Sequence, residues 1–438
     1  MRPRLIGGAV AGLSALAYGM LALRHHARFE VRSWDLAIFE QAIAGYARLD
    51  APIVDVKGPG FHVLGDHFSP ITALTAPVYR LLPGPQTLLL VQVLLVAWAL
   101  YVVTALAVRR LGAVTGTVLG VLCATSFGVQ SAIDAEFHEV AFAAPLLALA
   151  GAAWVEHRYT AVAVWSVPLV LVKEDLGITV MVVGALLWWA GERRLGGLTA
   201  AAGLVGFVVA VVVVLPAFND AGSYAYTGNL GGNAGLVDTV LAEPGTKLGA
   251  LLLTLAVTGF AALWSRWVLV VVPTFLWRFA GDVPTYWGIE WHYSLVLMPV
   301  VFCAAVEAVE RLPRLRWLVP IGVGVSAVLL VGSPLRELAD PETYRDTPRA
   351  AAAREAIDLL PEGASVETDI ALLSHVVTDH RAYWTGTIGD VTPEYVLFDT
   401  RVGIGSPLEP TTWAQTVHGG QWVTVYADEG IVLAKRER

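Results

Sequence analysis

The sequence predicts an α-helical integral membrane protein with about eleven transmembrane helices and a small extracytoplasmic α/β domain at its C-terminal end. Of the 438 residues, 56% are hydrophobic and only 15% are charged, whereas soluble domains average roughly 25% charged residues. The mean hydropathy is +0.63, and the apolar residues gather in long runs up to about residue 333. We therefore divide the chain into a transmembrane domain, 1–333, and an extracytoplasmic cap domain, 334–438.

Eleven apolar segments carry this prediction. Several are shorter than the ~20 residues that a straight span needs. The segments are residues 5–23, 86–108, 111–130, 140–155, 159–172, 176–190, 195–217, 248–264, 267–280, 293–309 and 317–332. The pair 159–172 and 176–190 could form two short helices or one long broken helix.

The charges orient the bundle. A cytoplasmic N-terminus gives the short inner loops eleven basic residues, which are Arg2, Arg4, Arg109, Arg110, Arg158, Arg193, Arg194, Arg266, Arg311, Arg314 and Arg316. Cytoplasmic loops are enriched in this way, and the long first outer loop, 24–85, can cross despite its own basic residues. Eleven crossings then place the C-terminal domain outside. The Ala-, Val-, Gly- and Arg-rich composition is typical of GC-rich bacteria, so we expect a bacterial plasma membrane.

The first outer loop contains an amphipathic segment that begins near Asp35. Leu36, Phe39, Ile43 and Tyr46 recur at helical spacing, which predicts a juxtamembrane helix lying along the membrane surface. This helix would hold Asp35 at the mouth of an outward-facing cavity. Alternatively, Asp35 is only the N-cap of that helix, a position that Asp favours.

Two further outer-loop clusters combine carboxylates with a base. Asp66 and His67 precede the second span, where they could bind a ligand or form a polar turn that ends at Pro70. Lys173, Glu174 and Asp175 lie between two short apolar segments. They could form a site facing a wet cavity, or neutralise one another at the interface.

The second and fifth outer loops supply the remaining candidates. If residues 134–138 are helical, Asp134 and His138 share a face, and with Glu136 they could bind Mg²⁺ or Mn²⁺. The alternative is a solvated helix cap. Arg278 could hold a phosphate or extend its guanidinium to the interface. The neighbouring polar residues His292 and Tyr293 complete the candidate set.

Several kinds of chemistry lack a signature here. The sequence has no Walker A loop, no nucleotide-binding glycine fingerprint, no His-Glu-x-x-His motif and no Gly-x-Ser-x-Gly elbow. We therefore expect no nucleotide cofactor, and nothing suggests a nucleic-acid partner. Cys123 and Cys303 lie inside apolar segments, so we expect no disulfide.

The C-terminal domain shows strand and helix patterns. Residues 362–366 read as a turn and a strand, 370–377 as a short helix and 395–398 as a strand. Residues 422–435 read as a hairpin around Asp428-Glu429-Gly430. An attached α/β domain of this kind would cap the outer face.

The motifs together resemble a family of bacterial and archaeal polytopic membrane proteins known only as a domain of unknown function. The matching stretches are 34–41, 64–70, 136–138, 171–177, 215–218 and 292–294, with 360–366 and 393–399 in the tail. They follow the order of that family. The chain departs from the family where Glu136-Phe137-His138-Glu139-Val140 replaces Asp-Phe-His-Pro-Glu, and where Glu40 replaces an Asp.

That family is similar in layout to the GT-C glycosyltransferases. The resemblance implies a membrane-embedded hexosyl- or pentosyltransferase that uses a sugar on polyprenyl phosphate and a glycan, lipid or protein acceptor of the cell envelope. Asp35 would be the catalytic base. Asp66, His67, Lys173, Glu174, Asp175, Arg278, His292 and Tyr293 would bind donor or acceptor, with Asp134, Glu136 and His138 as metal ligands.

Two other functions fit some of these observations. Ionisable residues near broken helices are also typical of secondary transporters and lipid flippases. The carboxylates gather at outer loops rather than at mid-membrane, and the two halves show no inverted repeat, which favours the enzyme. A non-catalytic envelope assembly protein is the third alternative.

Overall fold

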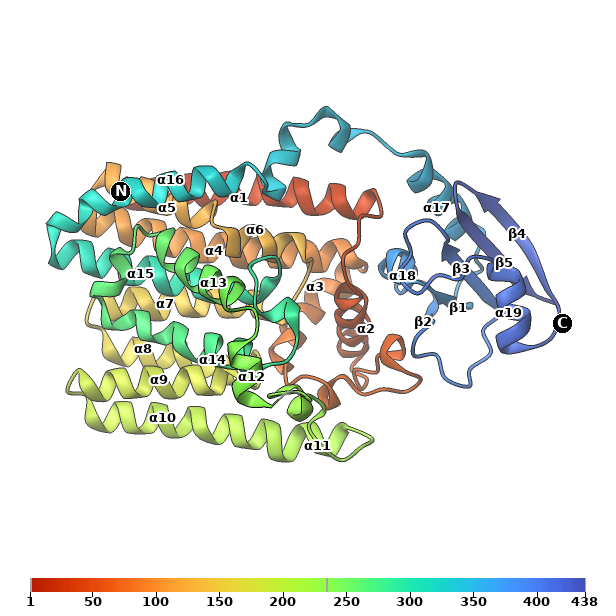
Figure 1. Cartoon of the computed structure of the whole chain (residues 1–438), viewed down its shortest axis with the longest axis horizontal. Helices are drawn as coiled ribbons and strands as arrows, with labels where there is room; N and C mark the ends of the chain where they lie inside the picture. Colours follow the sequence, from red (N-terminus) through yellow and green to blue (C-terminus); the bar gives the residue numbers. More distant parts are fainter. Residues whose placement is uncertain (1, 234, 438) are drawn as a thin grey trace. The chain divides into compact units, whose positions relative to one another are not determined.

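The computed structural model describes residues 2–233 and 235–437. They form two compact units, each built from segments that lie far apart in the sequence (Figure 1). The first unit contains Met1–Gly19, Leu64–Ile71 and Val91–Ala339, and the second contains Met20–Val63, Thr72–Leu90 and Asp340–Arg438. The division passes through helices α1 (Arg2–Ala27) and α4 (Pro85–Leu111).

The first unit is helical. Beyond its parts of α1 and α4, its helices are α5 (Ala113–Ala124), α6 (Phe127–Asp134), α7 (Ala143–Val155), α8 (Tyr159–Ser166), α9 (Leu176–Trp189), α10 (Arg193–Val208), α11 (Leu215–Phe218), α12 (Leu236–Leu241), α13 (Pro244–Ala256), α14 (Val272–Ala280), α15 (Leu297–Arg311) and α16 (Val319–Leu330). Each of the eleven apolar segments is helical over most of its length.

In the described part of the chain, six helical stretches are long and apolar enough to cross a membrane. They are Arg2–Ala27, Pro85–Leu111, Ala113–Asp134, Arg193–Phe218, His292–Arg311 and Pro313–Leu330. Glu139–Val155, Tyr159–Leu171 and Leu176–Trp189 are shorter apolar helices. The open question about residues 159–190 is settled, because α8 and α9 contact each other as two separate helices. The break between them holds Lys173, Glu174 and Asp175.

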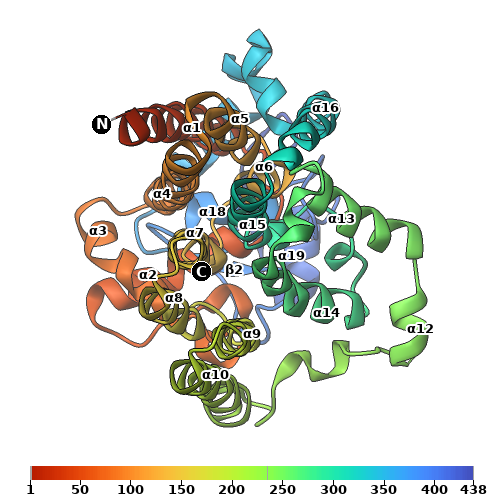
Figure 2. The same cartoon turned by 90° about the vertical axis from the view of Figure 1, so that its left-hand side faces the viewer.

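Helix α15 forms the core of the first unit. Its neighbours include α5, α6, α7 and α13, and Figure 2 shows α7 and α15 nearly end-on. Gly151 of α7 lets the two backbones approach, because a Cβ there would lie 2.8 Å from the Cβ of Cys303. Close contact of this kind is the main source of helix association in a bilayer, where no hydrophobic effect drives it.

Helices α9 and α10 also approach each other closely at glycine residues along their length. A Cβ on Gly184 would lie 2.4 Å from the backbone nitrogen of Ala200, and one on Gly203 would lie 2.5 Å from the carbonyl oxygen of Gly177. Small residues therefore set the separation of these helices. This packing fixes the start of α9, which directly follows the polar break at 173–175.

The second unit contains a five-stranded sheet with strand order β2-β1-β3-β5-β4. The strands are β1 (Ser365–Thr368), β2 (Arg381–Trp384), β3 (Tyr395–Asp399), β4 (Trp422–Asp428) and β5 (Ile431–Arg436). Strand β1 pairs in parallel with β2 and β3, and β5 pairs antiparallel with β3 and β4. Val396, Phe398, Ala414, Trp422 and Ala434 form a buried apolar cluster beside this sheet.

Three helices accompany the sheet, namely α17 (Pro348–Asp358), α18 (Ile370–Val376) and α19 (Pro410–His418). The predictions of β1, α18, β3 and the β4–β5 hairpin are confirmed. Strand β2 was not predicted. Helices α17 and α19 were not predicted either.

Helix α2 (Asp35–Arg48) also belongs to the second unit, together with α3 (Ala76–Leu81). The predicted stripe of Leu36, Phe39 and Ile43 is buried, but Ala37 and Ile38 are buried as well. The predicted helix is thus confirmed, and it packs against α3 and α18 inside the unit; its position along the membrane surface stays a prediction. The N-cap residue is Trp34 and Asp35 is the first helical residue, so the N-cap alternative was wrong.

Glu40 joins these helices through a buried carboxyl group. Its Oε1 accepts hydrogen bonds from Tyr79 Oη at 2.9 Å and from Thr378 Oγ1 at 2.5 Å. Burial raises the pKa of Glu40 to about 8, because the ionised form has lost its hydration. The folded protein therefore keeps this proton at neutral pH.

The free energy of unfolding should consequently fall as the pH rises from about 4.5 to 8, because the unfolded chain releases a proton that the folded chain retains. Glu40→Gln keeps a neutral acceptor and should remove this contribution, which amounts to about 1.4 kcal/mol per pH unit. Thermal unfolding of wild type and variant at pH 5, 6, 7 and 8 measures the difference. Glu355→Gln is the matched control, because Glu355 is exposed and accepts a hydrogen bond from Tyr426. If the difference in stability between wild type and Glu40→Gln does not change with pH, the prediction is contradicted.

Candidate charge cluster in the first unit

Polar segments that are distant in sequence meet in the first unit. The contributing residues are Asp66 and His67, Glu139, the break at 173–175, and Tyr224 and Tyr226 from the long segment before α12. All of them lie outside the candidate spans. We call this set the charge cluster.

Glu174 makes three hydrogen bonds in the charge cluster. It is buried, and its Oε1 lies 3.0 Å from His67 Nδ1 and 2.9 Å from Tyr224 Oη. Its Oε2 accepts the backbone N–H of Phe68 at 3.0 Å. Burial alone would raise the pKa of Glu174, but His67 and Lys173 lower it to about 2. Glu174 is therefore a permanently charged anchor for the loop that carries His67.

His67 responds to the same contacts. Burial and Lys173 would lower the pKa of His67, but Glu174 and Asp66 outweigh them and raise it. Its ring stacks on Tyr226 with centroids 4.6 Å apart, and Tyr226 Oη donates to Asp66 Oδ1 at 2.8 Å. The imidazolium form is therefore stabilised, which gives the charge cluster a second cation beside Lys173.

Lys173 pairs with Glu139 at 2.8 Å. Burial would lower the pKa of Lys173, but Glu139, Glu174 and Asp175 raise it well above its ordinary value. Asp175 is the N-cap residue of α9 and its side chain makes no capping hydrogen bond. Burial raises the pKa of Asp175 to about 7.

The second outer-loop motif does not form a helical face. Helix α6 ends at Asp134, Glu136 has a φ of +67° and His138 is extended. The prediction that Asp134 and His138 share a helix face was therefore wrong. Gln92 holds this turn: its amide donates to the carbonyl oxygens of Ala132 and Glu136, and its Oε1 accepts the His138 N–H at 2.9 Å.

The turn brings His138 against the fifth loop. The rings of His138 and His292 stack with centroids 3.5 Å apart, and both residues are buried. His292 lies within electrostatic range of His67 and Lys173. The structure thus brings the predicted residues of four different loops into one neighbourhood.

Arg278 holds the fifth loop from inside. Its guanidinium donates to the carbonyl oxygens of Tyr286 and Gly288 and to Ser294 Oγ. It is fully buried, so the alternative in which it extends to the interface was wrong. Tyr293 lies 5.9 Å from the guanidinium carbon, measured to the ring centroid. These contacts make Arg278 a residue that shapes the segment 286–294.

Some members of the charge cluster were missed as site residues. Tyr224 and Tyr226 lie in a segment without a recognisable motif, and only their contacts with Glu174 and Asp66 reveal them. Glu139 directly follows the predicted motif Asp134, Glu136 and His138 in the sequence, but it was not predicted as a site residue. Asp35 belongs to the second unit, where it is half-buried in the first turn of α2.

Asp134, Glu136 and His138 are the three residues predicted to bind a metal. Within residues 2–233 and 235–437, the ligand atoms of Asp134, Glu136 and His138 do not form a group within 4.8 Å of one another. A compact octahedral shell of oxygens is what Mg²⁺ demands. The residues as placed do not fit such an ion, so a metal at this position stays a prediction.

The fold and the apolar helices define a multi-pass membrane protein with an ArnT-like fold. The crystal structure of ArnT from Cupriavidus metallidurans bound to undecaprenyl phosphate matches with a TM-score of 0.60 and 12% sequence identity, over 97% of each chain. No curated protein matches the sequence. The chain belongs to the family described as Predicted membrane protein (DUF2079), whose model matches residues 25–433.

Proposed function

We propose that the protein is a membrane-embedded glycosyltransferase, which moves a sugar from a polyprenyl-phosphate donor to an extracytoplasmic acceptor of the cell envelope. The observation that carries this proposal is the buried charge cluster, which lies outside the spans of a chain with an ArnT-like fold. Buried charges are expensive and are retained mainly for function. The proposal includes eleven spans, a cytoplasmic N-terminus and an extracytoplasmic C-terminal domain.

In the proposed reaction, Asp35 is the general base and the cations of the charge cluster stabilise the leaving group. The acceptor hydroxyl attacks the anomeric carbon, its proton passes to the Asp35 carboxylate, and the bond between that carbon and the phosphate oxygen breaks. The electron pair leaves with polyprenyl phosphate, whose charge Lys173 and His67 would stabilise. Arg278 would position His292 and Tyr293 beside the ligand. Asp66 and Glu174 would orient His67.

Binding of undecaprenyl phosphate to the purified full chain tests the proposal. Lys173→Gln should weaken binding about tenfold or more, because a charge-assisted hydrogen bond contributes about 1.5–3 kcal/mol. Arg266→Gln is the matched control, since Arg266 is an exposed cation that lies over the ring of Trp189. Binding no tighter than that of phosphatidylglycerol would overturn the proposal and favour a transporter.

A further inference from the structure

The charge cluster contains four carboxyl groups, and Asp175 differs from the other three. Asp66 bonds to Tyr226, Glu139 pairs with Lys173, and Glu174 accepts three hydrogen bonds. The Oδ1 atom of Asp175 is shielded from solvent and has no hydrogen-bond partner within the described part of the chain. A buried oxygen of this kind is costly when it is ionised and much less so when it is protonated.

The groups that act on Asp175 come from every neighbouring segment. Lys173 and Glu174 precede it, Glu139 comes from the turn before α7, His67 from the first loop and Tyr224 from the segment before α12. When all four carboxylates are ionised, they outnumber the two cations Lys173 and His67. Burial is the main reason why the ionised form of Asp175 is disfavoured, and the negative charges of Glu174 and Glu139 add to that effect.

We propose that Asp175 determines when the charge cluster can accept an anion: a phosphate-bearing ligand binds with Asp175 protonated, so that binding takes up a proton at this carboxyl group. This inference rests on the proposed function, which supplies the phosphate. An entering phosphate would meet an uncompensated negative charge if Asp175 were ionised, and Coulomb repulsion is only weakly screened in a buried cluster. Protonation removes that charge without moving any atom of the site.

The proposal predicts how affinity depends on pH. Between pH 6 and pH 8 most of Asp175 loses its proton, so the affinity for a phosphate should fall by about tenfold from this group alone. The second ionisation of the ligand's own phosphate, near pH 6, and the titration of His67 also make the affinity depend on pH. These contributions remain in Asp175→Asn, which carries the neutral form permanently.

Calorimetric titration of the full chain with undecaprenyl phosphate at pH 6 and pH 8 tests the inference, using two buffers of different ionisation enthalpy. Wild type should take up a proton at Asp175, whereas Asp175→Asn should lack that uptake and lose about tenfold less affinity between the two pH values. Asp175→Glu should restore the uptake. Asp238→Asn, at an exposed carboxylate of α12 outside the charge cluster, should behave as wild type.

Inorganic phosphate provides a second arm. If inorganic phosphate binds with the same pH dependence, the charge cluster recognises the phosphate headgroup alone. If only undecaprenyl phosphate binds in this way, the lipid's hydrocarbon tail is also needed. Either result supports the inference. Equal pH dependence in wild type and Asp175→Asn would overturn it while leaving the proposed function intact. No specific binding by wild type at either pH would overturn the proposed function itself.

Discussion

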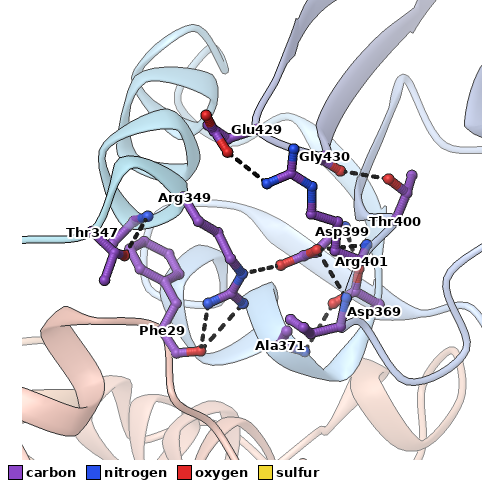
Figure 3. A network of polar contacts seen from close by, with 12 residues as sticks. Phe29, Thr347, Arg349, Asp369, Ala371, Asp399, Thr400, Arg401, Glu429 and Gly430 are labelled. Atoms are coloured by element: carbon purple, nitrogen blue, oxygen red, sulfur yellow. Dashed lines mark hydrogen bonds and ion pairs between the residues drawn. The ribbon is translucent and has the colours of Figure 1, made fainter.

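Replacing Arg349 by Ala should destabilise the second unit by about 3–5 kcal/mol, the usual cost of removing one partner of a buried ion pair. Arg349 extends from α17 and pairs with Asp399 at the end of β3, and it also donates to the carbonyl oxygen of Phe29 at 3.4 Å (Figure 3). Asp399 is fully buried. The variant would leave this carboxylate without its cation.

Hydrogen bonds connect Asp399 to β1 and α18, so removing Arg349 should also affect these two elements. The backbone N–H of Asp399 donates to Asp369 Oδ2 at 2.6 Å, and Asp369 Oδ1 accepts the N–H of Ala371 at the start of α18 (Figure 3). One arginine thus supports the ends of two parallel strands and the first turn of a helix. Because burial raises the pKa of Asp369 to about 7, this second carboxyl group carries little of the negative charge at mildly acidic pH.

Limited proteolysis of the full chain in detergent, together with thermal unfolding, measures the effect of Arg349→Ala. Arg401→Ala is the matched control, because Arg401 pairs with Glu429 on the surface, and exposed pairs contribute about 0–1 kcal/mol. Cleavage in residues 340–438 should accelerate only in Arg349→Ala. If the two variants resist protease equally, the buried pair does not stabilise the unit as we infer.

Asp35→Asn should reduce sugar transfer by about 10²- to 10⁴-fold while leaving the binding of undecaprenyl phosphate unchanged, because general base catalysis usually contributes that much. Asn has the same shape and keeps a hydrogen-bonding oxygen, but it cannot take up a proton at neutral pH. Helix α2 should remain folded, since its buried residues are unaffected.

The assay would screen sugars linked to undecaprenyl phosphate and follow the donor that wild type consumes. Asp50→Asn is the control, because Asp50 is exposed just beyond the end of α2. Normal turnover by Asp35→Asn would exclude Asp35 as the base. Loss of both binding and turnover would instead assign Asp35 to ligand binding or to folding.

Local patterns predicted much of the fold, and long-range contacts explain what they missed. Apolar runs located the helices, and short strand patterns, two of them beside turn residues, located β1, β3 and the β4–β5 hairpin, because these signals depend on neighbouring residues. The contacts of Glu174 with Tyr224 and of Glu40 with Thr378 join residues that are 50 and 338 positions apart. No local pattern contains such information.

The candidate site shows the same limit. Asp66, His67, Lys173, Glu174 and Asp175 were predicted because charges at helix ends are unusual in an apolar chain. The helical spacing of Asp134 and His138 misled, because Glu136 adopts a left-handed conformation that breaks the helix. Gln92, which holds that turn, lies inside an apolar helix and gave no sign of its role.

The second unit combines early and late parts of the chain, so it cannot be completed until synthesis is nearly finished. Helix α2 is made early, yet its partner α18 lies in the last part of the chain. At ribosomal rates of 5–20 residues per second, roughly 17 to 70 seconds separate the synthesis of Glu40 from that of Thr378. During this interval the apolar side of α2 must be shielded by something other than α18. A nascent chain arrested before residue 340 should therefore expose α2 to protease or to a chaperone.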